Sequence, residues 1–104
     1  MRESQIETPA VVRAERAGFF VRKVAWPGRR AAPDRVFAHA VRGTVWIEFK
    51  RPGEVATLGQ KNEHAKMRAA GMEVHVCDSV ELAMKVLWIG ADGEVMDPEA
   101  QSLV

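Results

Sequence analysis

The sequence contains little of what would mark a secreted, membrane-bound or strongly basic protein. Its one cysteine, Cys77, excludes an intrachain disulfide framework, fits a reducing compartment and is expected to be a buried core thiol. No apolar run is long enough for a signal peptide or for a helix that spans a bilayer, so we expect a cytoplasmic protein with no membrane partner. The formal net charge of +1 does not by itself indicate a nucleic-acid partner.

The 104 residues are enough for one domain with a hydrophobic core and leave no room for a second. Repeats and low-complexity segments are absent from the sequence. We expect a single domain over residues 1–104, with a core over about 3–88. The tail over 89–104, which carries Gly90, Gly93 and Pro98, should be loosely packed or used at a subunit contact.

Hydrophobic periodicity and turn residues predict an α/β fold with a mixed β-sheet flanked by helices, in the order α-β-β-β-α-β-α. Helices are predicted over 4–17, 58–70 and 79–87, and strands over 19–26, 35–41, 44–50 and 73–77. The strands on either side of Arg42-Gly43 should form an antiparallel hairpin. The last two strands are joined by a helix, so they should be parallel neighbours.

The helix ends carry their own signals. Ser4 to Glu7 has the form of a capping box, although Pro9 allows a later start with Thr8 as the N-cap. Gly71 should stop the second helix. Either residue of the Asp78-Ser79 pair should cap the third.

Two carboxylates and a lysine form the pattern most suggestive of chemistry. Side chains of a strand alternate between faces, so Glu48 and Lys50 share one face with Trp46. Asp34 follows a proline at a strand entry, which could bring its carboxylate to the end of the neighbouring strand. Two hard oxygen ligands would then converge, as Mg²⁺ or Mn²⁺ requires. The alternative is a surface salt bridge between Glu48 and Lys50, with Asp34 as a turn residue.

Basic residues cluster in the segment that leads to Asp34. The four that we expect to contact phosphates are Arg22, Lys23, Arg29 and Arg30. By contrast, the last fifteen residues carry acidic side chains and no basic one. The uneven distribution favours a nucleic-acid partner more than the net charge does.

Taken in order, five landmarks of this sequence resemble the VRR-NUC domains of the PD-(D/E)XK nuclease superfamily, over about residues 3–88. They are Ile6-Glu7 before Gly18, Val21-Arg22-Lys23, Gly28-Arg29-Arg30 before Pro33-Asp34, Glu48 to Gly53, and Gln60 with His64 leading into Val76 to Glu81. The resemblance implies a restriction-endonuclease-like core and a divalent metal, Mg or Mn.

The resemblance also implies roles for single residues. Glu7, Asp34, Glu48 and the carbonyl of Phe49 would be metal ligands. Lys50 would be the catalytic lysine, and Gln60 would line the catalytic site. Two positions depart from the family pattern: Lys23 replaces the second arginine of the name-giving motif, and Pro9 falls in the helix that must aim Glu7.

Other residues with chemical potential are expected to be structural. His64 should pack or hydrogen-bond between helix and sheet, because a single histidine without a partner at ligand spacing is weak evidence. The tryptophans Trp26, Trp46 and Trp88 are too widely spread in the sequence to predict a stacking platform, and Trp88 is expected in the core.

The function that these features favour is a metal-dependent deoxyribonuclease. The resemblance to stand-alone members of the family further implies a structure-specific endonuclease that cleaves branched DNA such as Holliday junctions as a homodimer. Two alternatives stay open: a monomeric flap or restriction-like nuclease, and a catalytically silent DNA-binding member of the fold. The dimer is suggested by the helix over 79–87, which is more apolar than a single core-facing stripe requires.

Overall fold

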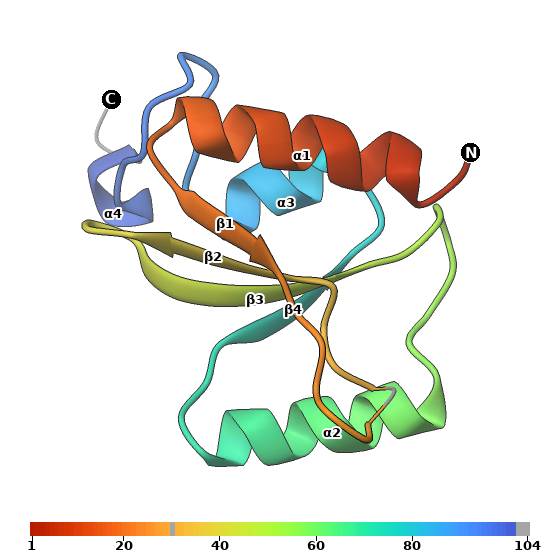
Figure 1. Cartoon of the computed structure of the whole chain (residues 1–104). Helices are drawn as coiled ribbons and strands as arrows, with labels where there is room; N and C mark the ends of the chain where they lie inside the picture. Colours follow the sequence, from red (N-terminus) through yellow and green to blue (C-terminus); the bar gives the residue numbers. More distant parts are fainter. Residues whose placement is uncertain (30, 102–104) are drawn as a thin grey trace.

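A computed structural model describes residues 1–29 and 31–101 of the chain, so Arg30 lies outside the described residues. The predicted element order is confirmed, with a short fourth helix added at the C-terminal end (Figure 1). The elements are α1 Ser4–Arg16, β1 Phe20–Lys23, β2 Arg35–His39, β3 Gly43–Phe49, α2 Leu58–Ala69, β4 Val74–Cys77, α3 Val80–Val86 and α4 Pro98–Gln101.

The four strands form one mixed sheet in the order β1-β2-β3-β4. β1, β2 and β3 are antiparallel neighbours, and β4 lies parallel to β3, as predicted. The β2–β3 turn spans Ala40 to Arg42 and closes on Gly43, whose φ of 84° favours glycine.

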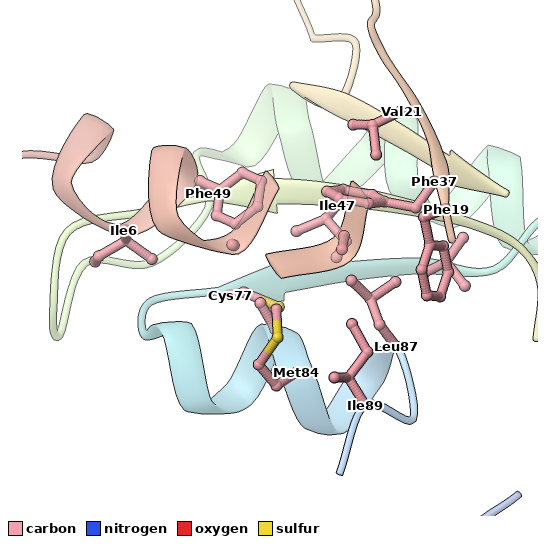
Figure 2. Packing of buried hydrophobic residues seen from close by; sticks show 14 residues of the cluster. Ile6, Phe19, Val21, Phe37, Ile47, Phe49, Cys77, Met84, Leu87 and Ile89 are labelled. Atoms are coloured by element: carbon pink, nitrogen blue, oxygen red, sulfur yellow. The ribbon is translucent and has the colours of Figure 1, made fainter. Parts of the chain in front are cut away.

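Helices cover the sheet on both faces. α1 and α3 lie on one face and α2 lies on the other (Figure 1). The main core is between the sheet and the α1–α3 layer, where Phe37, Ile47 and Phe49 meet Met84 and Leu87 (Figure 2). Because strand side chains alternate, this core leaves the even-numbered residues of β3 on the α2 face. Cys77 belongs to the core, as expected, and burial raises the pKa of its thiol to about 12.

The first helix begins at Ser4, so the alternative start at Thr8 is wrong. Ile6, Ala10 and Ala14 recur one turn apart and are buried, and the small alanines allow the helix to lie close to its neighbours. The predicted capping box is also wrong, since residue Ser4 already lies within the helix and the N-cap residue makes no side-chain cap.

β1, β2 and β4 are shorter than predicted because each needs a partner, whereas β3 keeps its predicted length and is shifted by one residue. β1 ends at Lys23, which pairs with Arg35, the first residue of β2. Only one further bond extends this pairing, from the backbone N–H of Val24 to the carbonyl of Asp34 at 3.0 Å. Residues 25 and 26 therefore have no strand beside them and enter the loop.

The ends of α2 and α3 confirm the remaining signals. Gly71 follows α2 with a φ of 89°, and the backbone N–H of Met72 bonds back to the carbonyl of Met67 at 3.0 Å. Ser79 is the cap of α3 and accepts a hydrogen bond from the backbone N–H of Leu82 at 3.0 Å. Among the described residues, no helix has both the length and the apolar character needed to cross a membrane.

The segment after α3 is packed more firmly than we expected of a loose tail. Ile89 is buried in the core cluster, and Val95, which pairs with it through an isolated bridge, packs against that cluster. Trp88 was expected in the core but is only half-buried, and the Arg42 guanidinium lies 4.2 Å from its ring centre. Its φ of 62° turns the chain away from α3.

Candidate active site

The candidate site lies where β2 begins and β3 ends. Arg35 pairs with Ile47, so one step further along the same register Asp34 comes opposite Glu48. Asp34 Oδ2 accepts a hydrogen bond from the backbone N–H of Phe49 at 2.6 Å, which holds its carboxyl at the end of β3. The structure thus brings Asp34 and Glu48 together from two neighbouring strands.

The carboxyls of Asp34 and Glu48 are close enough to interact through a hydrogen bond. Burial, reinforced by the negative charge of Asp34, raises the pKa of Glu48 to about 8, and the positive charge of Lys50 opposes this shift. Burial also raises the pKa of Asp34, against the lowering effect of its bond to Phe49. At neutral pH the two carboxyls therefore share a proton.

Lys50 stands beside this pair on the same face. It is 7% exposed and Glu48 is 3% exposed, so neither is a surface residue. No ion pair joins the two side chains in the described part of the chain, and the alternative of a surface salt bridge is wrong. The strand holds Lys50 firmly, because its backbone N–H bonds to the carbonyl of Cys77 at 2.9 Å.

Glu7, on α1, lies close enough to Asp34 to affect its pKa, but the Glu7 carboxylate is paired with Arg35. Its Oε2 lies 2.6 Å from Nε of Arg35, and both side chains are largely buried. The negative charge of Glu7 still raises the pKa of Asp34. Across residues 1–29 and 31–101, no three carboxylate, imidazole or thiol side chains converge on one metal position.

On α2, Gln60 and His64 have different surroundings. Gln60 completes a capping box. Its side-chain Oε1 accepts a hydrogen bond from the backbone N–H of Thr57 at 2.9 Å, and its backbone N–H donates to Thr57 Oγ1 at 3.2 Å. His64 is 1% exposed, and its Nε2 lies 3.8 Å from Glu48 Oε1. Burial, together with the nearby positive charges of Arg68 and Lys50, lowers the pKa of His64 and keeps it neutral.

The predicted phosphate-binding residues do not share one surface. Arg22 and Lys23 are consecutive in β1 and therefore point to opposite faces of the sheet. Arg22 and Arg29 are exposed, and Arg29 lies 4.0 Å from Glu63 on α2. Arg22 is on the same face as Glu48, since it pairs with Val36, which in turn pairs with Trp46.

The wide spacing of Trp26 and Trp46 in the sequence does not keep their rings apart in the structure. Trp26, on the loop after β1, and Trp46, on β3, lie with ring centres 5.7 Å apart and planes inclined at 52°. Both rings are half-buried. The chain brings them together because the loop that starts at Val24 returns to the sheet at Asp34.

Comparison with known proteins agrees with this arrangement. No family model matches the chain. A solved structure of a VRR-NUC domain is similar with a TM-score of 0.74 and 30% sequence identity, over 81% of this chain and 91% of that chain. "Putative nuclease p44" of Acyrthosiphon pisum secondary endosymbiont phage 1 is 39% identical over 83 residues, 80% of this chain and 89% of that protein. The chain belongs to the VRR-NUC family.

The acid pair of this VRR-NUC domain suits a hard divalent cation. Carboxylate oxygens of Asp34 and Glu48, with the carbonyl oxygen of Phe49, are the donor types that Mg²⁺ and Mn²⁺ prefer. Glu48 Oε1 is buried and has no hydrogen-bond partner among the described residues. A buried carboxyl oxygen without a partner is costly, and a cation in place of the proton would relieve both that cost and the repulsion within the pair.

The raised pKa of Glu48 leads to a prediction about stability. Between about pH 4.5 and pH 8 the carboxyl is protonated in the folded VRR-NUC domain and ionised in the unfolded chain, so its stabilising contribution is lost as pH rises through this window. Glu48→Gln cannot ionise, so the free energy of unfolding of wild type should fall relative to that variant by about 1.4 kcal/mol per pH unit.

Urea denaturation of both proteins in EDTA, from pH 5 to pH 8.5, measures this difference. Glu81→Gln, which changes an exposed glutamate of α3, is the matched control and should follow the wild-type curve. A constant difference between wild type and Glu48→Gln across the window would contradict the shared proton.

Proposed function

We propose that this VRR-NUC domain is a divalent-metal-dependent DNA endonuclease that hydrolyses phosphodiester bonds. The observation that supports this most strongly is the close pair of half-buried Asp34 and buried Glu48, with buried Lys50 beside it. Placing two carboxyls side by side, one of them buried, destabilises a fold, so a role in structure or in simple DNA binding does not account for them. The name of the similar phage protein supports the same activity.

Asp34, Glu48 and the Phe49 carbonyl would hold the ion, Mg²⁺ or Mn²⁺. Glu7 would have to exchange Arg35 for the ion in order to join them. A divalent ion there supplies neutralisation of the phosphate oxygens and a water of lowered pKa.

Lys50 and Gln60 are the proposed catalytic residues of the chain itself. The Lys50 ammonium would stabilise negative charge that develops on the phosphate and help to orient the attacking water. Lys50 directly follows the last residue of β3, and its burial limits the positions available to its amine. Gln60, whose Oε1 is occupied by the helix cap, has only its amide N–H₂ to offer to water or phosphate.

Cleavage by single-residue variants tests the activity. Asp34→Ala and Glu48→Ala should abolish Mg²⁺- or Mn²⁺-dependent cleavage while DNA binding stays intact or becomes tighter, because repulsion of phosphate is removed. Lys50→Ala should lose most activity yet bind the metal as wild type does. The measurement uses labelled linear duplex, flap and four-way junction DNA, with Glu81→Ala as the control.

Wild-type cleavage rates in Asp34→Ala or Glu48→Ala would show the site assignment to be wrong. Loss of metal binding in Lys50→Ala would contradict the role of that residue. A wild-type protein that binds DNA but never cuts it would favour the catalytically silent alternative.

Exposed basic residues near the site would contact DNA phosphates. Arg22 lies on the face that carries Glu48, and Arg29 lies on the loop that leads to Asp34. Arg30 is proposed for the same role by its position in the sequence, and Lys23 would contact a strand that passes over the edge at β1. Phosphate contacts of this kind position DNA without reading its sequence.

The salt dependence of binding measures these contacts. Neutralising Arg29 and Arg30 together should weaken binding to all sequences alike and reduce the slope of log K against log salt by about one unit per lost contact. Lys85→Ala, on the exposed side of α3, is the matched control. An unchanged slope in the double variant would place this loop away from DNA.

The proposed substrate is branched DNA such as a Holliday junction, and the proposed assembly that cleaves it is a homodimer. Symmetric cutting of two strands by a domain this small needs two copies related by a twofold axis. α3 does not support the contact, because its Ala83 and Met84, and the C-cap residue Leu87, are buried in the monomer's own core. Two large hydrophobic side chains at the start of α2 are exposed: Val55, in the preceding loop, at 70%, and Leu58, the first residue of the helix, at 75%.

Light scattering at micromolar concentration distinguishes the two enzyme alternatives. Wild type should have the mass of a dimer, and Leu58→Asp should lower it if the Val55–Leu58 surface forms the contact. Leu82→Asp, a variant at a hydrophobic residue with only 37% exposure on α3, is the comparison. A strict monomer that cuts flaps alone would favour the monomeric flap nuclease.

A further inference from the structure

The sheet face that carries the acid pair continues past it toward β1 and is partly open. Strand pairing sets Trp46 of β3 beside Val36 of β2, and Val36 beside Arg22 of β1. α2 packs against β4, the strand at the opposite edge of the sheet from β1. On β1, Arg22 is exposed, and Phe20 has an exposed fraction of 55%.

Flat side chains are the distinguishing feature of this open face. Trp26 and Trp46 form a tilted pair with ring centres 5.7 Å apart, and neither ring is fully buried. At the β1 edge, the Arg22 guanidinium lies 4.0 Å from the centre of the Phe20 ring. The tryptophan pair is near the acid pair, because Glu48 is two residues beyond Trp46 on the same face, about 7 Å along the strand.

Partly exposed rings beside arginines suit one kind of ligand. The two faces of a base within a duplex are covered by its neighbours, whereas an unpaired base offers a face to an aromatic side chain. Arg22 and Arg29 supply the positive charge that the phosphates of such a strand require. The loop that carries Trp26 is anchored by the Val24 to Asp34 hydrogen bond, so the ring has a fixed relation to the acid pair.

We propose that the Trp26–Trp46 pair is a stacking site for one unpaired base of the DNA strand that lies next to the cut, with Phe20 and Arg22 as the continuation of that site toward β1. The inference rests on the proposed function. It gives that function a physical reason to select DNA with an unpaired segment, since fully paired duplex presents no free base to the rings.

The test combines removal of the ring with removal of the base. Two flap DNAs are compared, one intact and one with an abasic residue at the unpaired position next to the branch; both keep every phosphate. Binding to wild type and Trp26→Leu is measured by fluorescence anisotropy in EDTA at pH 7 and low salt, where no cleavage occurs. Trp26→Phe retains an aromatic ring and is the matched variant.

Loss of the base should weaken wild-type binding by at least about fivefold, and Trp26→Leu should bind both DNAs equally at the weaker level. Trp26→Phe should still prefer the intact flap. Equal binding of the two DNAs by wild type, or an undiminished preference in Trp26→Leu, would overturn the inference. If Trp26→Leu proves unfolded by circular dichroism, the wild-type comparison decides the question alone.

Because this experiment measures binding without metal, its outcome is separate from that of cleavage. A protein that cuts DNA but shows no preference for the intact flap refutes the stacking site alone. A protein that shows the preference but never cuts refutes the endonuclease and leaves the stacking site in place.

Discussion

The close approach of two carboxyls, half-buried Asp34 and buried Glu48, is the constraint on which this molecule depends. The β2–β3 register places them opposite each other, and the bond from the Phe49 N–H keeps Asp34 from turning away. Left without a cation, the pair resolves its repulsion by holding a proton, which raises the pKa of Glu48 to about 8. The proton marks a position where the fold can accept positive charge.

Such a pair needs a rigid sheet, and the sheet is rigid because its two faces carry different kinds of side chain. The face under α1 and α3 is filled by apolar side chains such as Phe37 and Ile47, which contribute most of the stabilising burial. The opposite face can then carry charged and aromatic groups that stabilise little. The strand period of two allows both at the end of β3, where Ile47 and Phe49 belong to the core and Glu48, with Lys50 just after the strand, belongs to the site.

Period and turn residues were enough to predict the element order, the hairpin and the parallel last pair. The errors lie where a local signal competed with tertiary contacts. Ser4 to Glu7 has the letters of a capping box, but Glu7 binds Arg35 instead; the box that forms is Thr57 with Gln60, which has the same spacing. The lengths of β1, β2 and β4 were overestimated because the sequence does not say where a partner strand begins.

In the candidate site, too, the local pattern predicted some features and tertiary contacts decided the others. Strand alternation correctly set Glu48 and Lys50 on one face, and the proline before Asp34 indicated where its carboxylate would go. The Trp26–Trp46 contact and the position of His64 against Glu48 depend on the path of a loop and on the placement of a helix, which no spacing in the sequence encodes. The helix over 79–87 looked over-apolar because the core that buries it comes from distant strands and from α1.

Proton release on metal binding tests the central claim most directly. Isothermal titration of Mn²⁺ into the protein at pH 7, in two buffers with different ionisation enthalpies, counts the protons displaced. With the pKa of Glu48 near 8, wild type should release about one proton per ion bound, and Glu48→Gln should release far less. Equal binding heats for wild type in both buffers, or the same release from Glu48→Gln, would contradict a proton held by the acid pair in place of the metal.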